Sequence, residues 1–161
     1  MHPIIRAVPV ALLLASCRGP APETFSTQHQ AALRDSAAQV MQAISREVGA
    51  QGFTAWIPYL DTSPRFVWTS DGSIEFPDAD SLARFIRGFA ATLTHTELAW
   101  DSLRVAALAP GVALATTCYR EMWVGQRRDT TRVQGVFVGV LVNGLSGWRL
   151  VSGNTSHAST H

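Results

Sequence analysis

The 161-residue sequence contains no lysine, so arginine supplies all 13 of its basic side chains. The 12 acidic residues nearly balance them, and no basic run is longer than Arg127-Arg128. A surface that follows a phosphate backbone needs clustered positive charge, which this sequence does not have. It also has no glycine-rich phosphate loop. These absences argue against nucleic acid as a partner.

Long apolar runs are scarce, and the main one stands near the N-terminus. Residues 7–14 are apolar but too few to span a bilayer as a stable anchor. They lead into the tetrapeptide Leu14-Ala15-Ser16-Cys17. This arrangement resembles a bacterial lipoprotein signal, in which cleavage occurs before a cysteine that receives acyl chains. An ordinary secretory signal is the alternative.

The resemblance to a lipoprotein signal implies how the N-terminal segment is processed. Residues 1–16 would be the signal peptide, Cys17 the lipidation site and residues 17–26 a tether. Acyl chains on Cys17 would anchor the chain in the bacterial cell envelope. Because Arg18 follows that cysteine in place of aspartate, the resemblance implies the outer membrane, with the domain facing the periplasm.

Cysteine is also nearly absent, since Cys118 is the only one besides Cys17. With Cys17 acylated, no disulfide could form within the chain, and stability would have to come from packing. No histidine stands near Cys118 in the sequence. We therefore expect Cys118 to be a small apolar core residue and not a nucleophile.

Helical periodicity occurs in three segments of the first half. Apolar residues at helical spacing predict a helix over residues 28–48, ended by Gly49. A shorter helical segment over residues 53–59 contains Pro58, so it cannot be a long regular helix. A third helix is expected after Asp78, the N-cap. Its buried stripe is predicted to contain Leu82, Phe85, Ile86, Phe89 and Leu93.

Strand patterns dominate the second half of the chain. The predicted strands cover residues 65–69, 74–76, 96–108, 112–124, 131–142 and 148–157. Turn residues separate the long strands, so they should form an antiparallel meander. Helices that precede such a meander predict an α+β fold. In this fold, N-terminal helices pack on one face of a curved, mostly antiparallel sheet.

The last hairpin carries a family resemblance. An apolar strand is followed by a turn, by Gly147-Trp148-Arg149 and by a polar Thr-Ser-His ending at His157. This hairpin and the order of elements resemble the SnoaL-like group of the nuclear transport factor 2-like superfamily. The resemblance implies a cone-shaped domain over residues 27–157 with a tail at residues 158–161. It also implies a homodimer, because members commonly pair through the sheet.

Polar and aromatic side chains could line the wide end of such a cone. Alternation along one strand places Tyr119, Glu121 and Trp123 on a common face. Arg132 and Gln134 share a face of the next strand, and we expect them at the same mouth, which would suit a small molecule. An outer sheet face or a dimer contact is the alternative. The predicted ligand-binding residues are Trp56, Tyr59, Trp68, Tyr119, Glu121, Trp123, Arg132 and Gln134.

Few side chains are candidates for acid–base chemistry. Enzymes of the superfamily resemble one another in using an aspartate or histidine base inside an apolar cone, and Asp61 and His157 are the candidates here. Asp71 is assigned to a turn and Asp101 to an exposed strand position. No metal site is expected, because His157 and His161 lie in a tail without a helical stripe.

No motif pairs an acid with a base, which favours binding over catalysis. The sequence therefore predicts an envelope-anchored domain that binds a small apolar or amphipathic ligand in its cone, without a cofactor. A cofactor-independent isomerase, cyclase or hydrolase and a structural dimerisation module are the alternatives.

Overall fold

The structure is a computed structural model that describes residues 25–158. The predicted signal peptide, Cys17 and residues 159–161 of the predicted tail lie outside the described residues. In chain order the elements are α1 (Thr27–Gln51), the 3-10 helix η1 (Phe53–Tyr59), β1 (Val67–Ser70), β2 (Ser73–Phe76), α2 (Ala79–Ala90), β3 (Leu93–Ala109), β4 (Val112–Gly125), β5 (Thr130–Gly144) and β6 (Gly147–His157).

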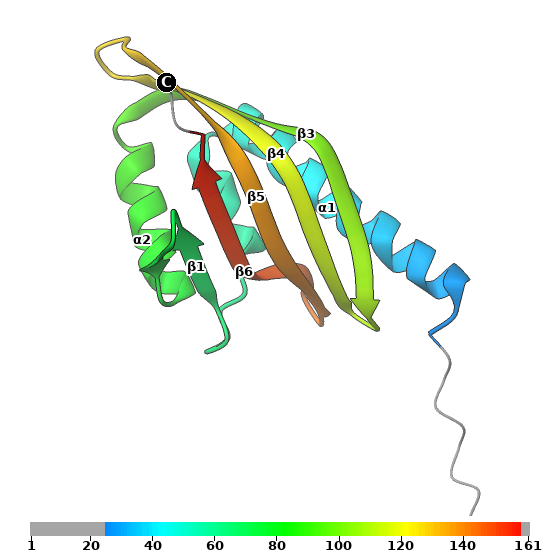
Figure 1. Ribbon diagram of the computed structural model, residues 1–161. Helices are drawn as coiled ribbons and strands as arrows, with labels where there is room; N and C mark the ends of the chain where they lie inside the picture. The colour runs from blue at the N-terminus through cyan, green and yellow to red at the C-terminus, as the bar shows by residue number, and fades with distance from the viewer. Residues whose placement is uncertain (1–24, 159–161) are drawn as a thin grey trace, which may run out of the picture.

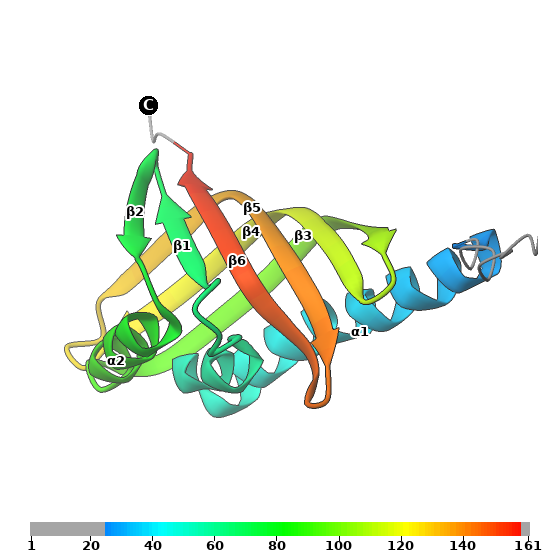
Figure 2. The same cartoon turned by 90° about the horizontal axis from the view of Figure 1, so that it is seen from below.

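The strands form a six-stranded sheet in the order β2-β1-β6-β5-β4-β3 (Figure 1). Strands β1 and β6 run parallel, and the other neighbouring strands run antiparallel. Seen from below, the sheet curves over α1 and α2, which cover its concave face (Figure 2). The predicted α+β fold, with helices on one face of a curved, mostly antiparallel sheet, is confirmed.

Helix α1 is capped by Ser26 and continues past the residue at which the sequence predicted its end. The Ser26 side chain accepts a hydrogen bond from the backbone N–H of His29 at 3.2 Å and forms the N-cap. The helix continues through Gly49 and stops at Gly52, whose φ of 87° favours glycine. The prediction that Gly49 ends the helix is wrong, because a glycine within a helix costs only about 1 kcal/mol. The helix continues through the exposed residues 49–51 before it stops.

The core lies between α1 and the concave face of the sheet. Met41, Ile44 and Val48 stand at helical spacing on α1 and are almost fully buried. On β4, the buried residues Ala113 and Ala115 are small, so the long helix can lie close to the sheet. Within residues 25–158, no helix has both the length and the apolar character needed to cross a membrane.

Helix α2 closes the open end of the concave face. Asp78 caps it by accepting a backbone N–H at 2.6 Å, as predicted. Leu82 and Ile86 are buried, but Phe85 is 45% exposed and Leu93 belongs to β3. The predicted buried stripe is therefore wrong at these two positions, because the helix ends at residue 90 and packs through a narrower face.

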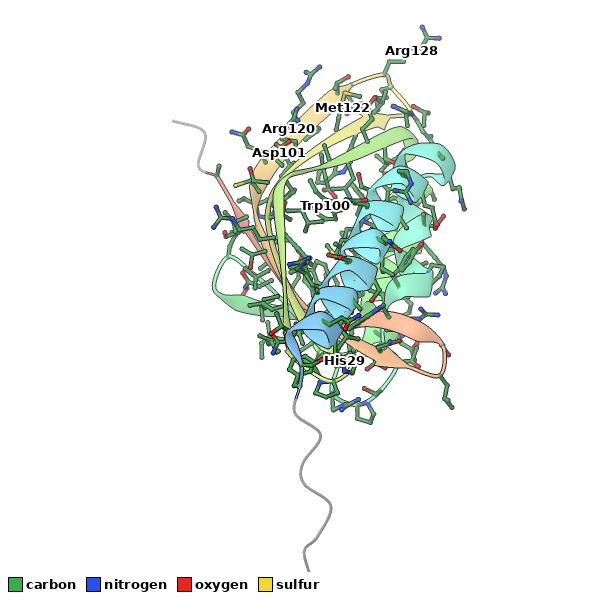
Figure 3. All side chains as sticks on the ribbon, turned by 90° about the vertical axis from the view of Figure 1, so that its right-hand side faces the viewer. His29, Trp100, Asp101, Arg120, Met122 and Arg128 are labelled. Atoms are coloured by element: carbon green, nitrogen blue, oxygen red, sulfur yellow. The ribbon has the colours of Figure 1, made fainter. Side chains whose placement is uncertain are left out.

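The convex face of the sheet is open to solvent. Figure 3 shows Trp100 pointing into the space between sheet and α1, whereas Asp101 and Arg120 lie on the outer side. Arg120 makes two hydrogen bonds to the Asp101 carboxylate, at 2.6 and 2.8 Å. Cys118 shares this outer face and is exposed. The prediction that Cys118 is a core residue is wrong, because alternation along β4 turns it away from the helices.

Candidate functional site

A cavity of about 150 Å³ lies between the concave face of the sheet, η1 and α2. Most of its wall is apolar. Its aromatic rings come from the helices η1 and α2 and from the strands β1 to β5. They are Phe53, Trp56, Trp68, Phe76, Phe85, Trp100, Tyr119, Trp123 and Phe137.

Four of these rings form the inner end of the cavity. Trp56 lies nearly perpendicular to Trp68 and to Trp100, with each pair of ring centroids 5.9 Å apart. Phe137 lies 5.7 Å from Trp68 and 5.5 Å from Trp100. Contacts of this kind add to the stabilisation that burial alone provides. The rings therefore form a fixed wall around the inner space.

Two paired glycines of the sheet leave space for aromatic rings of the cavity wall. Gly153 on β6 faces the Trp68 ring, and a Cβ atom added there would overlap the ring. On the paired position of β5, a Cβ atom at Gly139 would overlap the Phe137 ring. Both rings can therefore lie flat against the backbone of the sheet.

Strand β4 supplies the polar side chains of the cavity. Tyr119, Glu121 and Trp123 stand at alternate positions and all line it, as the predicted alternation requires. The Tyr119 hydroxyl and the Trp123 indole N–H are buried and have no hydrogen-bond partner among the described residues. Buried polar groups of proteins are nearly always paired. Two unpaired groups beside one cavity indicate that a ligand or water completes them.

The electrostatics of the site centre on Glu121. Burial raises the pKa of its carboxyl group to about 7, although the charge of His157 and the Trp123 N–H act in the opposite direction. Burial and the nearby charge of Glu121 also raise the pKa of Tyr119 to about 12. At neutral pH the Tyr119 hydroxyl is therefore protonated, while Glu121 can both release and accept a proton.

A histidine–aspartate pair stands at the mouth of the cavity. The Asp71 carboxylate accepts the backbone N–H of His157 at 2.9 Å and lies 2.6 Å from its Nδ1. These hydrogen bonds lower the pKa of Asp71, the backbone bond most strongly. The His157 ring lines the cavity and lies 6.4 Å from the Tyr119 ring. Asp71 thus fixes the orientation of the imidazole, as a carboxylate does beside many functional histidines.

Six of the side chains singled out in the sequence come together at this cavity. They are Trp56, Trp68, Tyr119, Glu121, Trp123 and His157. Tyr59 does not join them, because its hydroxyl donates a hydrogen bond to Glu47 of α1 at 2.8 Å, away from the cavity.

Arg132 and Gln134 are also misplaced by the sequence prediction. In the register of β4 and β5, Arg132 pairs with Met122 and Gln134 with Arg120. Paired residues of neighbouring strands project to the same side of a sheet. Both side chains therefore lie on the outer face, where they line a second hollow that Glu121 and His157 also border. No salt bridge joins Arg132 to Glu121 among the described residues.

Asp61 is a structural residue of the loop between η1 and β1. Its carboxylate accepts hydrogen bonds from the backbone N–H and the hydroxyl of Ser63, at 3.0 and 2.9 Å. It does not line the cavity. The choice of Asp61 as an acid–base candidate is therefore wrong, and Asp71, which was assigned only to a turn, is the carboxylate that meets His157.

The sequence interpretation missed Trp100 and Phe137 because each stands in a strand without any local mark of function. It missed Asp71 because this residue and His157 are 86 positions apart and meet only through the parallel pairing of β1 with β6. Within residues 25–158, no group of three or more histidine, cysteine, aspartate or glutamate side chains is arranged to hold a metal ion.

No protein-family model matches the sequence, and no curated protein matches it. Several solved structures, however, are similar to the fold of this chain. A nuclear transport factor 2-like superfamily protein from Salmonella enterica serovar Typhimurium has a TM-score of 0.67 and 15% identity, over 81% of this chain and 94% of that one. A protein from Streptomyces avermitilis, provisionally described as a dehydratase of the same family, has a TM-score of 0.69 and 12% identity, over 81% and 99%.

A third similar structure, from Novosphingobium aromaticivorans, is provisionally described as a scytalone dehydratase. Its TM-score is 0.66 and its identity 8%, over 79% of this chain and 85% of that one. Identities this low establish a shared fold and nothing about a shared reaction. The chain has the cone fold of the nuclear transport factor 2-like proteins, as the resemblance in its sequence implied.

Proposed function

We propose that the protein binds one small, mainly apolar organic molecule inside its cone, with a polar group of the ligand near Tyr119 and Glu121. The observation that carries this proposal is the buried hydroxyl of Tyr119, a residue that lines the cavity, because this hydroxyl has no partner within residues 25–158. Leaving such a group unpaired costs about 1–3 kcal/mol. A ligand that pairs with it recovers this free energy only in the bound state.

The size of the cavity limits the ligand. A volume of about 150 Å³ is close to that of an engineered apolar cavity that binds benzene. It is below the range of about 300–1,000 Å³ that is typical for drug-sized ligands. The ligand is therefore about as large as one six-membered ring or a short branched chain.

Native mass spectrometry of the purified full-length chain tests this proposal. We expect a bound mass of small-molecule size in the wild type and its loss or reduction in Tyr119→Phe. The chain offers a matched control, because its only other tyrosine, Tyr59, bonds to Glu47 outside the cavity. Equal retention by Tyr119→Phe and Tyr59→Phe would contradict the proposed binding site.

Proton transfer on the bound molecule is a second candidate function. It is favoured by the oriented His157–Asp71 pair and by Glu121, whose pKa of about 7 suits a group that both takes and gives a proton at neutral pH. Tyr119 would hydrogen-bond to the oxygen on which negative charge develops. This chemistry belongs to cofactor-independent isomerases and dehydratases, and two of the similar structures are provisionally described as dehydratases.

Deuterium exchange separates catalysis from binding. The molecule recovered from the protein is incubated with it in D₂O and followed by NMR. Exchange of a C–H hydrogen in the wild type that stops in Glu121→Gln supports proton transfer. A molecule that binds and stays unexchanged and chemically unchanged leaves binding as the function.

The envelope location is also our proposal, and it is supported by the signal-like segment before Cys17. Residues 1–16 act as a signal peptide, and acylated Cys17 holds the domain at the outer membrane, facing the periplasm. Membrane fractionation of Cys17→Ser tests this, because the variant should fold normally but leave the membrane fraction. Unchanged membrane retention would rule out anchoring through Cys17.

We propose further that two copies pair through the convex face of the sheet, as the family resemblance implies. This face includes Val136, which is 41% exposed, beside a row of β-branched residues on β5. A charge in that row, as in Val136→Glu, should shift a dimer to monomer in analytical ultracentrifugation. A wild type that is monomeric would contradict the dimer proposal and would leave the proposed ligand site unaffected.

A further inference from the structure

The charged groups around the cavity are mostly acidic. Glu121 lies within it and Glu75 lines its rim, while His157 is paired with the Asp71 carboxylate. No arginine is among the residues that line it, and the chain has no lysine. None of the salt bridges among residues 25–158 involves Glu121. The cavity therefore has an excess of negative charge.

The inner wall adds a second source of negative potential. Three tryptophans, Trp56, Trp68 and Trp100, surround the space together with Phe137, and neighbouring ring centroids are 5.5–6.4 Å apart. The face of an aromatic ring carries partial negative charge, and tryptophan attracts cations most strongly. These rings pack against one another and also line the cavity, so they offer this negative potential to a cation held in it.

A buried carboxylate without a basic partner is costly. Taking Glu121 out of water disfavours its charged form, and the cost is recovered only if a positive charge or several hydrogen bonds compensate it. The protein compensates this cost only in part, because the charge of His157 and the poorly aligned Trp123 N–H do not outweigh the effect of burial. A cation supplied by the ligand would compensate this charge.

We propose that the ligand is a small organic cation, a quaternary or protonated amine whose charged group lies in the aromatic cavity and is neutralised by Glu121. The proposal rests on the proposed binding function and specifies the ligand's chemical class. An oxygen on the same molecule can pair with the Tyr119 hydroxyl.

The proposal requires binding to depend on pH in a defined direction. Glu121 attracts a cation only as a carboxylate, so affinity should be highest above about pH 7 and should fall as Glu121 gains a proton. His157 faces Glu121 from β6, and Glu75 stands at the rim. Asp71 stays a carboxylate because its hydrogen bonds to His157 lower its pKa, and Tyr119 stays neutral because its pKa is raised to about 12.

A pair of compounds with the same shape tests the charge itself. Choline carries a quaternary ammonium group, and 3,3-dimethylbutan-1-ol replaces its nitrogen by carbon. Binding of each to the full-length chain is followed by tryptophan fluorescence, since four of the five tryptophans line the cavity. We expect choline to bind about tenfold more tightly at about pH 8 and this advantage to disappear well below pH 7.

Two variants complete the test. Glu121→Gln should remove the preference for choline and keep the binding of the neutral alcohol. Glu97→Gln, which makes the same change on β3 outside the cavity, should leave the preference intact. Equal or tighter binding of the alcohol by the wild type would overturn the cation proposal and leave the proposed binding function standing. Failure of both compounds to bind would contradict the cation proposal and count against the proposed function as well.

Discussion

Replacing Tyr119 by phenylalanine removes one buried oxygen and keeps the ring that fills the cavity wall. In most buried tyrosines the hydroxyl is hydrogen-bonded, and its removal costs about 0.5–1.5 kcal/mol. The Tyr119 hydroxyl has no partner among the described residues, and the side chain is only 3% exposed. Its removal should therefore recover the desolvation cost of the group, about 1–3 kcal/mol, and make the ligand-free protein more stable.

The expected gain is large enough to measure. For a domain of this size, 1 kcal/mol shifts the midpoint of thermal unfolding by about 4 °C. Urea unfolding of the ligand-free chain gives the free energy directly. Tyr59→Phe is the reference, because loss of its 2.8 Å bond to Glu47 should destabilise the protein. If Tyr119→Phe destabilises the protein as much as Tyr59→Phe does, the hydroxyl is already paired and our argument from an unpaired group fails.

Three further substitutions test other parts of the site. Glu121→Gln should raise stability by at most about 3 kcal/mol near pH 8. The gain should vanish below pH 4.5, where Glu121 is protonated in both states, because its pKa is about 7 in the folded protein and 4.5 in the unfolded chain. Equal urea midpoints for the variant and the wild type at all pH values would contradict this. Gly153→Ala should destabilise the protein by about 1–3 kcal/mol through overlap with an aromatic ring, whereas Gly144→Ala, with no atom nearby, should not. Asp71→Asn should keep the fold and speed amide hydrogen exchange at His157, whose N–H the carboxylate accepts; unchanged protection would show that this bond does not hold the strand end.

The fold was predictable because its signals are local and repeated. Apolar residues recur at helical spacing in α1, and β-branched residues are dense in β5, so element type and order follow from these patterns. The same periodicity placed Tyr119, Glu121 and Trp123 on one face of one strand. It is a property of a single strand, and it needs no knowledge of the neighbouring strands.

The relation between strands was not predictable in this way. Whether Arg132 faces the cone depends on the register between β4 and β5, and a shift of one residue reverses every side chain. The structure pairs Arg132 with Met122, which puts it on the outer face. Asp71 and His157 depend on a still longer-range feature, the parallel pairing of β1 and β6. Neither strand has a sequence pattern from which its neighbour in the sheet could be predicted.

The departures from ordinary packing in this protein are concentrated in one place. Elsewhere in the described chain, Trp100 donates its indole N–H to the Met41 carbonyl at 2.6 Å, and Trp148 donates its own to Ser36 at 3.0 Å. Trp123, by contrast, leaves its N–H unpaired beside the unpaired Tyr119 hydroxyl. Near them stands Glu121, whose carboxyl group has its pKa raised to about 7 by burial. A sequence selected for stability alone would replace these groups with apolar residues at a gain of free energy. Their clustering around one cavity is therefore best explained by a ligand that pairs with them, because stability is commonly sacrificed where a site must bind or react.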